Sequence, residues 1–86
     1  MSELVIKYGV ETNYIDVTAV ALSRCLHDGL LIIPASDYAR ALIFSDPIIG
    51  VVKHILVVKD GISTIYPANE YIRLILSSEV LNIQLN

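Results

Sequence analysis

The chain has 86 residues, of which 55% are apolar and 17% charged, and its formal net charge at pH 7 is −3. The six basic residues are scattered singly, which excludes the basic surface that nucleic acids and anionic membranes require. No uncharged apolar run approaches the roughly 20 residues of a membrane span, and the early Glu3, with no basic segment before it, is not typical of a signal peptide. We therefore expect a cytoplasmic or otherwise intracellular protein.

The length predicts a single β-rich domain, residues 1–86. A domain of this size buries only about 60–65% of the surface that its unfolded chain exposes. The chain nevertheless carries more apolar residues than the roughly 45–50% of an average domain. Two explanations stay open: strands that are buried on both faces, or an exposed apolar patch that closes on a second copy or on another protein.

Two runs near the start of the chain predict a β-hairpin. Residues 3–10, ELVIKYGV, alternate with a period of two and break at Gly9, and residues 13–17, NYIDV, follow after Glu-Thr. A further strand is expected over residues 30–34, LLIIP, a run that carries no charge and ends at Pro34.

One short helix is expected between these strands, over about residues 19–27. Asp16 or Thr18 offers a side-chain oxygen that can cap the start of the helix. Gly29 stands where a left-handed residue would end it.

Residues 35–50 give weaker signals than the segments on either side. Aspartate, proline and glycine are spaced along this stretch, and each favours a turn or a break in regular structure. We expect a long ordered loop with a short helical turn at about residues 38–42.

The strongest local pattern is a hairpin in the second half of the chain. Residues 51–59, VVKHILVVK, are followed by Asp60-Gly61 and then by residues 62–66, ISTIY. A two-residue turn sets the register of the two strands. The expected opposite pairs are Lys59 with Ile62, Val57 with Thr64 and Ile55 with Tyr66. Both faces of residues 51–58 are largely apolar, which predicts a central strand that is covered on both sides.

The end of the chain predicts two more strands, residues 70–76 and residues 80–85. The second, VLNIQL, alternates apolar and polar side chains and contains neither lysine nor proline. An edge strand of this kind is a template for pairing with another chain, although it can equally complete its own sheet. We take it as the preferred dimerisation element.

The interface hypothesis therefore combines the apolar face of this last strand with the apolar face of the central strand. Its residues are Leu81, Ile83, Leu85, Ile55 and Val57.

No constellation of residues predicts catalysis, a metal site or a cofactor. Cys25 and His27 lie close in sequence, but a structural zinc site wants four Cys or His ligands, and the chain has three such residues in total. Cys25 in its apolar stretch and His54 in its apolar strand are typical of core residues. The four glycines lie far apart, so there is no glycine-rich phosphate cradle.

The tyrosines give an alternative interpretation. Aromatic faces stack on sugar rings, and phenolic hydroxyls bond to sugar hydroxyls. The candidate ligand-binding residues are Tyr8, Tyr14, Tyr66 and Tyr71. All four fall in expected strands, where cross-strand packing is the ordinary use of tyrosine.

Several motifs resemble one known domain. These are YIDVT, DGLLIIPAS, FSDPIIGVVKHILVV and NEYIRL, spread over residues 14–76. Together they resemble the small C-terminal domain, of uncharacterised function, of the mitochondrial DnaJ-like proteins of subfamily C member eleven. The specific parts are Asp16-Val17-Thr18, and Asp46-Pro47 with Gly50 and Lys53 after it. The resemblance implies a β-rich appended interaction module. The chain has no J-domain, so neither chaperone activity nor mitochondrial location is carried over.

The expected fold is mainly β: a small antiparallel sandwich or open barrel of about six strands with one short helix. The leading interpretation of function is a non-enzymatic protein–protein interaction or assembly module that self-associates, as a homo-oligomer, or binds another protein through an edge strand and apolar surface. The alternative is a β module that binds a small ligand or carbohydrate with its tyrosines.

Overall fold

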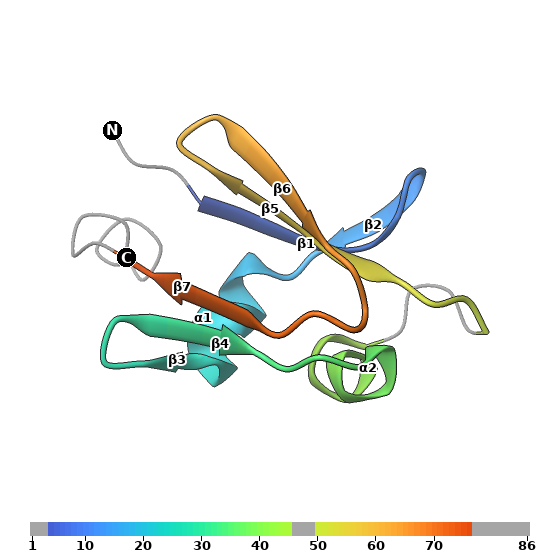
Figure 1. The fold of residues 1–86 in the computed structure, drawn as a ribbon, viewed down its shortest axis with the longest axis horizontal. Coiled ribbons are helices and arrows are strands. Elements are labelled where there is room, and N and C mark those ends of the chain that lie inside the picture. Colours follow the sequence, from blue (N-terminus) through green and yellow to red (C-terminus); the bar gives the residue numbers. More distant parts are fainter. Residues whose placement is uncertain (1–3, 46–49, 77–86) are drawn as a thin grey trace.

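The computed structural model describes residues 4–45 and 50–76, and these form a mainly β fold with two helices and no closed barrel (Figure 1). This confirms the expected fold class. The elements in chain order are β1 Leu4–Val10, β2 Asn13–Asp16, α1 Thr18–Arg24, β3 Leu26–His27, β4 Leu30–Ile33, α2 Asp37–Phe44, β5 His54–Lys59, β6 Ile62–Tyr66 and β7 Ile72–Ile75. The expected strand at residues 80–85 lies outside the described residues.

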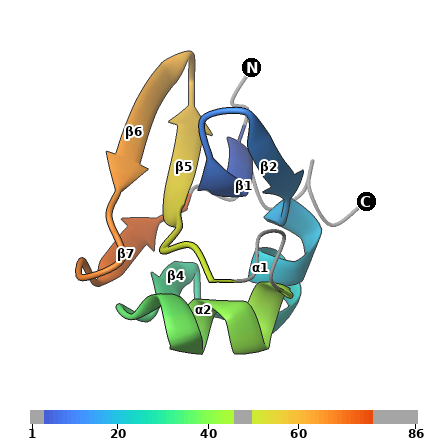
Figure 2. The same ribbon diagram turned by 90° about the vertical axis from the view of Figure 1, so that its right-hand side faces the viewer.

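Every pairing between the described strands is antiparallel, and the strands form two sheets. The first sheet has the order β2-β1-β5-β6 and the second has the order β3-β4-β7. In Figure 2 the sheets meet at an angle, with β6 and β7 on one side of the molecule and α1 on the other. Both β6 and β7 are edge strands on that side.

The core lies between the two sheets and is closed by the helices. The alternation of β1 and β5 sends every second side chain inward, where it meets the inward side chains of β4 and β7. The buried apolar residues are Leu4, Ile6, Tyr8, Val17, Ala21, Leu22, Cys25, Leu31, Ile33, Phe44, Ile55, Val57, Ile72 and Leu76. The strands β1, β4, β5 and β7 therefore each turn one face toward the core.

The Asp-Gly turn forms the hairpin that its sequence predicts. Asp60 and Gly61 both have positive φ, 52° and 82°, as a type I′ turn requires. The observed partners match the expected register. They include Lys59 with Ile62, Val57 with Thr64 and Ile55 with Tyr66.

A second Asp-Gly turn shortens the expected helix. Asp28 and Gly29 also have positive φ, 51° and 78°, and they join β3 to β4 as a small hairpin. Gly29 therefore serves a turn between strands and does not cap a helix. As a result α1 ends at Arg24, three residues before the expected end at residue 27.

Asp16 and Thr18 tie the start of α1 to the first sheet. The Asp16 carboxylate accepts from the Thr18 N–H at 2.9 Å and from its hydroxyl at 2.7 Å. The Thr18 hydroxyl oxygen in turn accepts from the Ile6 N–H at 2.8 Å. The N-cap residue of α1 is Val17, which makes no side-chain cap bond, so the expectation that Thr18 caps the helix is wrong. Asp16 binds the N–H of the first helical residue, and the Thr18 hydroxyl links the helix to β1.

Two other expectations differ from the structure. The turn of helix expected at residues 38–42 is a full helix, α2, because Phe44 on its inner side packs into the core. The expectation that β5 is covered on both faces is wrong for the described residues. Ile55 and Val57 face the core, whereas His54, Leu56 and Val58 are half-buried on the outer face, which no described element covers.

Gly9 in β1 holds the tightest backbone approach of the four glycines. Its φ is 153°, and a Cβ built there would lie 2.1 Å from the Asn13 carbonyl oxygen. Backbone atoms cannot move aside as the tip of a flexible side chain can. The β1–β2 hairpin therefore requires glycine at this position.

We predict that Gly9→Ala lowers the free energy of unfolding by roughly 2–4 kcal/mol, because the added methyl group collides with backbone. The matched control is Gly61→Ala, where a Cβ would meet no atom within 4 Å. In that variant the free energy of unfolding should fall only by the cost of placing alanine in a left-handed backbone conformation, about 1–2 kcal/mol. Urea unfolding of both variants checks the prediction, and equal losses would contradict it.

Candidate functional site

β6 is the most exposed of the described strands. β6 pairs with β5 on one side, has no described strand on the other, and is exposed from Ile62 to Ile65. Its sequence, ISTIY, has no charged residue, and Pro67 follows only after the strand ends. The devices that usually blunt an edge strand, lysine or proline within it, are absent from β6.

The hairpin geometry shows which backbone groups the β6 edge presents. A two-residue turn makes its flanking residues, Lys59 and Ile62, a hydrogen-bonded pair. Hydrogen-bonded and non-hydrogen-bonded pairs alternate along an antiparallel ladder, so Thr64 and Tyr66 also bond to β5. The N–H and C=O groups of Ser63 and Ile65 therefore point away from β5, toward the open edge.

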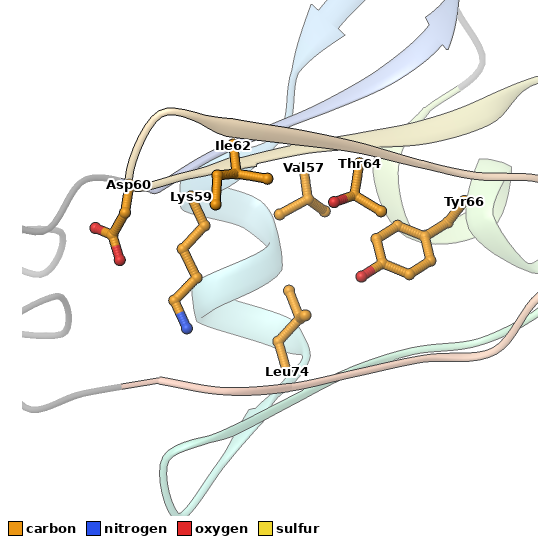
Figure 3. A pocket seen from close by; sticks show the side chains of 7 residues that line it. All are labelled: Val57, Lys59, Asp60, Ile62, Thr64, Tyr66 and Leu74. Atoms are coloured by element: carbon orange, nitrogen blue, oxygen red, sulfur yellow. The ribbon is translucent and has the colours of Figure 1, made fainter.

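A pocket lies beneath β6, between the first sheet and β7 (Figure 3). Its volume is about 290 Å³, close to the lower end of the range for small-molecule sites. Its lining residues are Val57, Lys59, Asp60, Ile62, Thr64, Tyr66 and Leu74. In Figure 3 Leu74 rises from β7 toward the β5–β6 hairpin above it, so the floor is apolar, whereas the roof combines apolar side chains with those of Lys59 and Thr64.

Lys59 crosses one end of this pocket. Its ammonium group donates to the carbonyl oxygen of Ile75 on β7 at 3.3 Å. The side chain thus links β5 to the edge strand β7, and its aliphatic stem adds to the apolar lining. Ile75 itself points outward and is 80% exposed.

A buried polar cluster lies on the other side of the core. Lys53 is 1% exposed, and its ammonium lies 3.1 Å from Asp37 Oδ2. The other carboxylate oxygen, Asp37 Oδ1, accepts from the Tyr8 hydroxyl at 2.5 Å and from the Lys53 N–H at 3.2 Å. The Lys53 ammonium also lies 5.7 Å from the centre of the Tyr8 ring.

This cluster joins three parts of the chain: Tyr8 on β1, Asp37 at the start of α2, and Lys53 just before β5. Tyr8 is fully buried and Asp37 is 20% exposed, so a substrate has little access to the ionised groups. Burial of the Asp37 carboxyl opposes its ionisation, but the hydrogen bonds from Tyr8 and Lys53 and the Lys53 charge outweigh this and lower its pKa. The cluster therefore holds the start of α2 against β1 and the segment before β5.

Arg40 makes a second buried connection from the same helix. It is fully buried, and its guanidinium donates to the carbonyl oxygens of Pro34 at 2.8 Å and Pro67 at 3.0 Å, and to those of Tyr66 and Glu70. Burial lowers the pKa of Arg40, while nearby charges act in the opposite direction. The helix α2 is thereby fixed to the connection between β6 and β7.

The residues of the interface hypothesis fall in two groups. Ile55 and Val57 are buried in the core, at 0% and 3% exposure, and their side chains are turned away from any partner of the outer face. Val57 also lines the roof of the pocket. The other three, Leu81, Ile83 and Leu85, lie outside the described residues.

The four candidate tyrosines lie in different environments. Tyr8 is buried, and Tyr71 is exposed in the segment before β7. Tyr14 shares a hydrogen bond and an edge-on ring contact with His54, across the side-chain-free Gly9 that pairs with both. Tyr66 lines the pocket, and it is the candidate that a ligand there would meet.

The Cys and His residues form no site in the described part of the chain. Cys25 is buried, and this burial raises the pKa of its thiol more than the nearby Arg24 lowers it. His27 is exposed on β3. No three His, Cys, Asp or Glu side chains gather as metal ligands among residues 4–45 and 50–76. Neither described helix is long and apolar enough to cross a membrane.

Comparisons of the chain with protein-family models, with curated proteins and with solved structures found no match. The resemblance to the C-terminal domain of the DnaJ-like proteins therefore stays a prediction from the residues. What can be said of function comes from the open β6 edge and the pocket beneath it.

Sequence reasoning missed the polar cluster and Arg40. Charged residues usually lie on a solvated surface, and nothing in the local sequence marks Asp37 or Arg40 as a residue that binds buried groups. The sequence did offer a signal for Lys53: it is the one charge within the apolar run before Lys59, which indicates a buried charge that needs a partner. Pairing it with Asp37 requires the tertiary fold.

We predict that Asp37→Asn lowers the free energy of unfolding by roughly 3 kcal/mol at pH 7, because it removes the carboxylate from a buried ammonium. Since the pKa of Asp37 is lower in the folded state, its contribution is present above about pH 4 and is lost as the pH falls further. Urea unfolding between pH 7 and pH 3 should show a smaller acid loss in the variant than in the wild type.

The matched control for this measurement is Asp28→Asn. Asp28 is exposed in a turn whose left-handed backbone asparagine accepts, so the change should be below about 0.5 kcal/mol. An Asp37→Asn variant as stable as this control, with the same acid loss as the wild type, would mean that the ion pair does not hold the fold.

Proposed function

We propose that the protein is a non-enzymatic interaction module that assembles through the side of the molecule formed by β6 and β7. The observation that carries this proposal is the uncharged edge of β6, with outward backbone groups at Ser63 and Ile65 and a pocket below it. Strand addition uses these features: main-chain hydrogen bonds supply affinity, and pockets for alternate side chains supply specificity.

Exposed apolar side chains on the same two strands support the proposal. Ile62 is 70% exposed, Ile65 57% and Ile75 80%. Full burial of an isoleucine side chain contributes about 1.5–3 kcal/mol, so covering these residues supplies a driving force for association. The proposed association would therefore bury part of the apolar surplus that the sequence shows.

The resemblance to a small C-terminal domain agrees with the proposal, because it implies an appended interaction module. The absence of catalytic groupings in the sequence agrees with a role outside catalysis. We place the module inside the cell, as the sequence predicts.

We predict that Ile62→Lys weakens self-association at least tenfold. The substitution puts a solvated charge on the open edge, where a partner strand would have to bury it. Light scattering after size exclusion, over a range of protein concentrations, measures the effect. The wild type should give a multiple of 9.5 kDa.

The matched control is Leu42→Lys on α2. Leu42 is 69% exposed, nearly as much as Ile62, but it lies on another part of the surface. It should associate as the wild type does. A wild-type monomer at all concentrations, or equal effects of the two lysines, would contradict the proposed interface.

The pocket favours a second candidate function, the binding of a small ligand such as a sugar. Tyr66 gives it an aromatic face, and Thr64 and Lys59 give it hydrogen-bonding groups. This candidate predicts saturable quenching of tyrosine fluorescence by a glycan, lost in Tyr66→Leu and kept in Tyr71→Leu. A flat response across a broad glycan panel would remove it.

A further inference from the structure

The β6 strand is self-complementary, and this identifies a partner. We propose that the β6 edge pairs with the β6 edge of a second copy, antiparallel, about a two-fold axis at Thr64. The inference rests on the proposed function and names its partner and register. A two-fold interface uses the same residues on both copies, so the backbone groups and side chains of β6 must pair favourably with those of a second β6.

The backbone groups satisfy this condition. With Thr64 at the axis, Ser63 of each copy lies opposite Ile65 of the other. Ser63 and Ile65 are the residues whose N–H and C=O groups point outward from the hairpin. Each opposite pair can therefore exchange both of its hydrogen bonds, and Thr64 falls in the non-hydrogen-bonded pair between them.

The side chains of two β6 strands also pair favourably in this register. The same register puts Ile62 opposite Tyr66 of the second copy, and Thr64 opposite Thr64. Aromatic with β-branched pairs and threonine pairs are favourable across strands. No charged side chain lies in β6, so no like charges meet. The exposed Ile62, at the pocket mouth, gains an aromatic cover.

The other edges among the described strands fit less well. β2 ends in Asp16 and β7 contains Arg73, so both carry a charge into a pairing with themselves. β3 has only two residues. β6, with five residues, is the longest of these edges. Pairing through it joins the two four-stranded sheets into one continuous sheet.

Cysteine cross-linking tests the register. In a non-hydrogen-bonded antiparallel pair the Cα atoms lie about 4.5 Å apart, within the roughly 4.4–6.8 Å that a disulfide spans. Thr64→Cys should therefore form a covalent dimer under mild oxidation. The matched control is Ile62→Cys, which is equally on β6, but two copies of residue 62 would be about 13 Å apart along the strands. The native Cys25 is buried and does not compete.

We expect Thr64→Cys to cross-link at least tenfold faster than Ile62→Cys, as measured on non-reducing gels at a concentration where light scattering shows association. A second pair of variants tests the hydrogen bonds. Ser63→Pro removes an outward N–H and spares the β5 ladder, so it should abolish association, while Ser63→Ala should keep it.

The outcomes separate the two proposals. If the protein associates but Thr64→Cys cross-links no faster than Ile62→Cys, or Ser63→Pro associates normally, the β6 pairing is overturned and the interaction module stands. If the wild type is monomeric and neither cysteine cross-links, self-association fails as well.

Discussion

The ion pair between Asp37 and Lys53 fixes the arrangement on which the rest of the structure depends. The Asp37 carboxylate accepts from Tyr8 on β1 and from Lys53 ahead of β5, so the start of α2 is held against the first sheet. From the same helix Arg40 donates to the carbonyl of Tyr66 at the end of β6, and to those of Pro67 and Glu70 in the connection between β6 and β7. One helix thus sets the position of both edge strands, and with it the open side of the molecule.

β6 is left exposed because the core between the two sheets does not extend beneath it. β1 and β5 face β4 and β7 across the core, and β6 extends the first sheet beyond this contact. The inward face of β6 therefore covers a pocket where the other strands cover core residues. A chain of 86 residues with this much apolar material leaves some of it at an edge. In the proposed function, association through the β6 edge covers this apolar surface.

Local patterns account for what could be predicted. Alternation and the Asp60-Gly61 turn predict the β5–β6 hairpin with its register, because both depend on neighbouring residues. The pattern of Asp28-Gly29 is the same, but the adjacent helix signal obscured it. Which strand lies at an edge, and which charges are buried, depend on pairings between distant residues. For that reason the β6 edge and the buried Lys53 became visible only in the fold.

Amide hydrogen exchange at β6, followed residue by residue by NMR at low and high protein concentration, tests whether two β6 edges pair. In the free chain the outward amides of Ser63 and Ile65 should exchange rapidly, whereas the amide of Thr64, bonded to β5, should be protected. If two β6 edges pair, the amides of Ser63 and Ile65 should become protected as the concentration rises. Association without that protection, or rapid exchange of both amides at every concentration, would contradict this pairing.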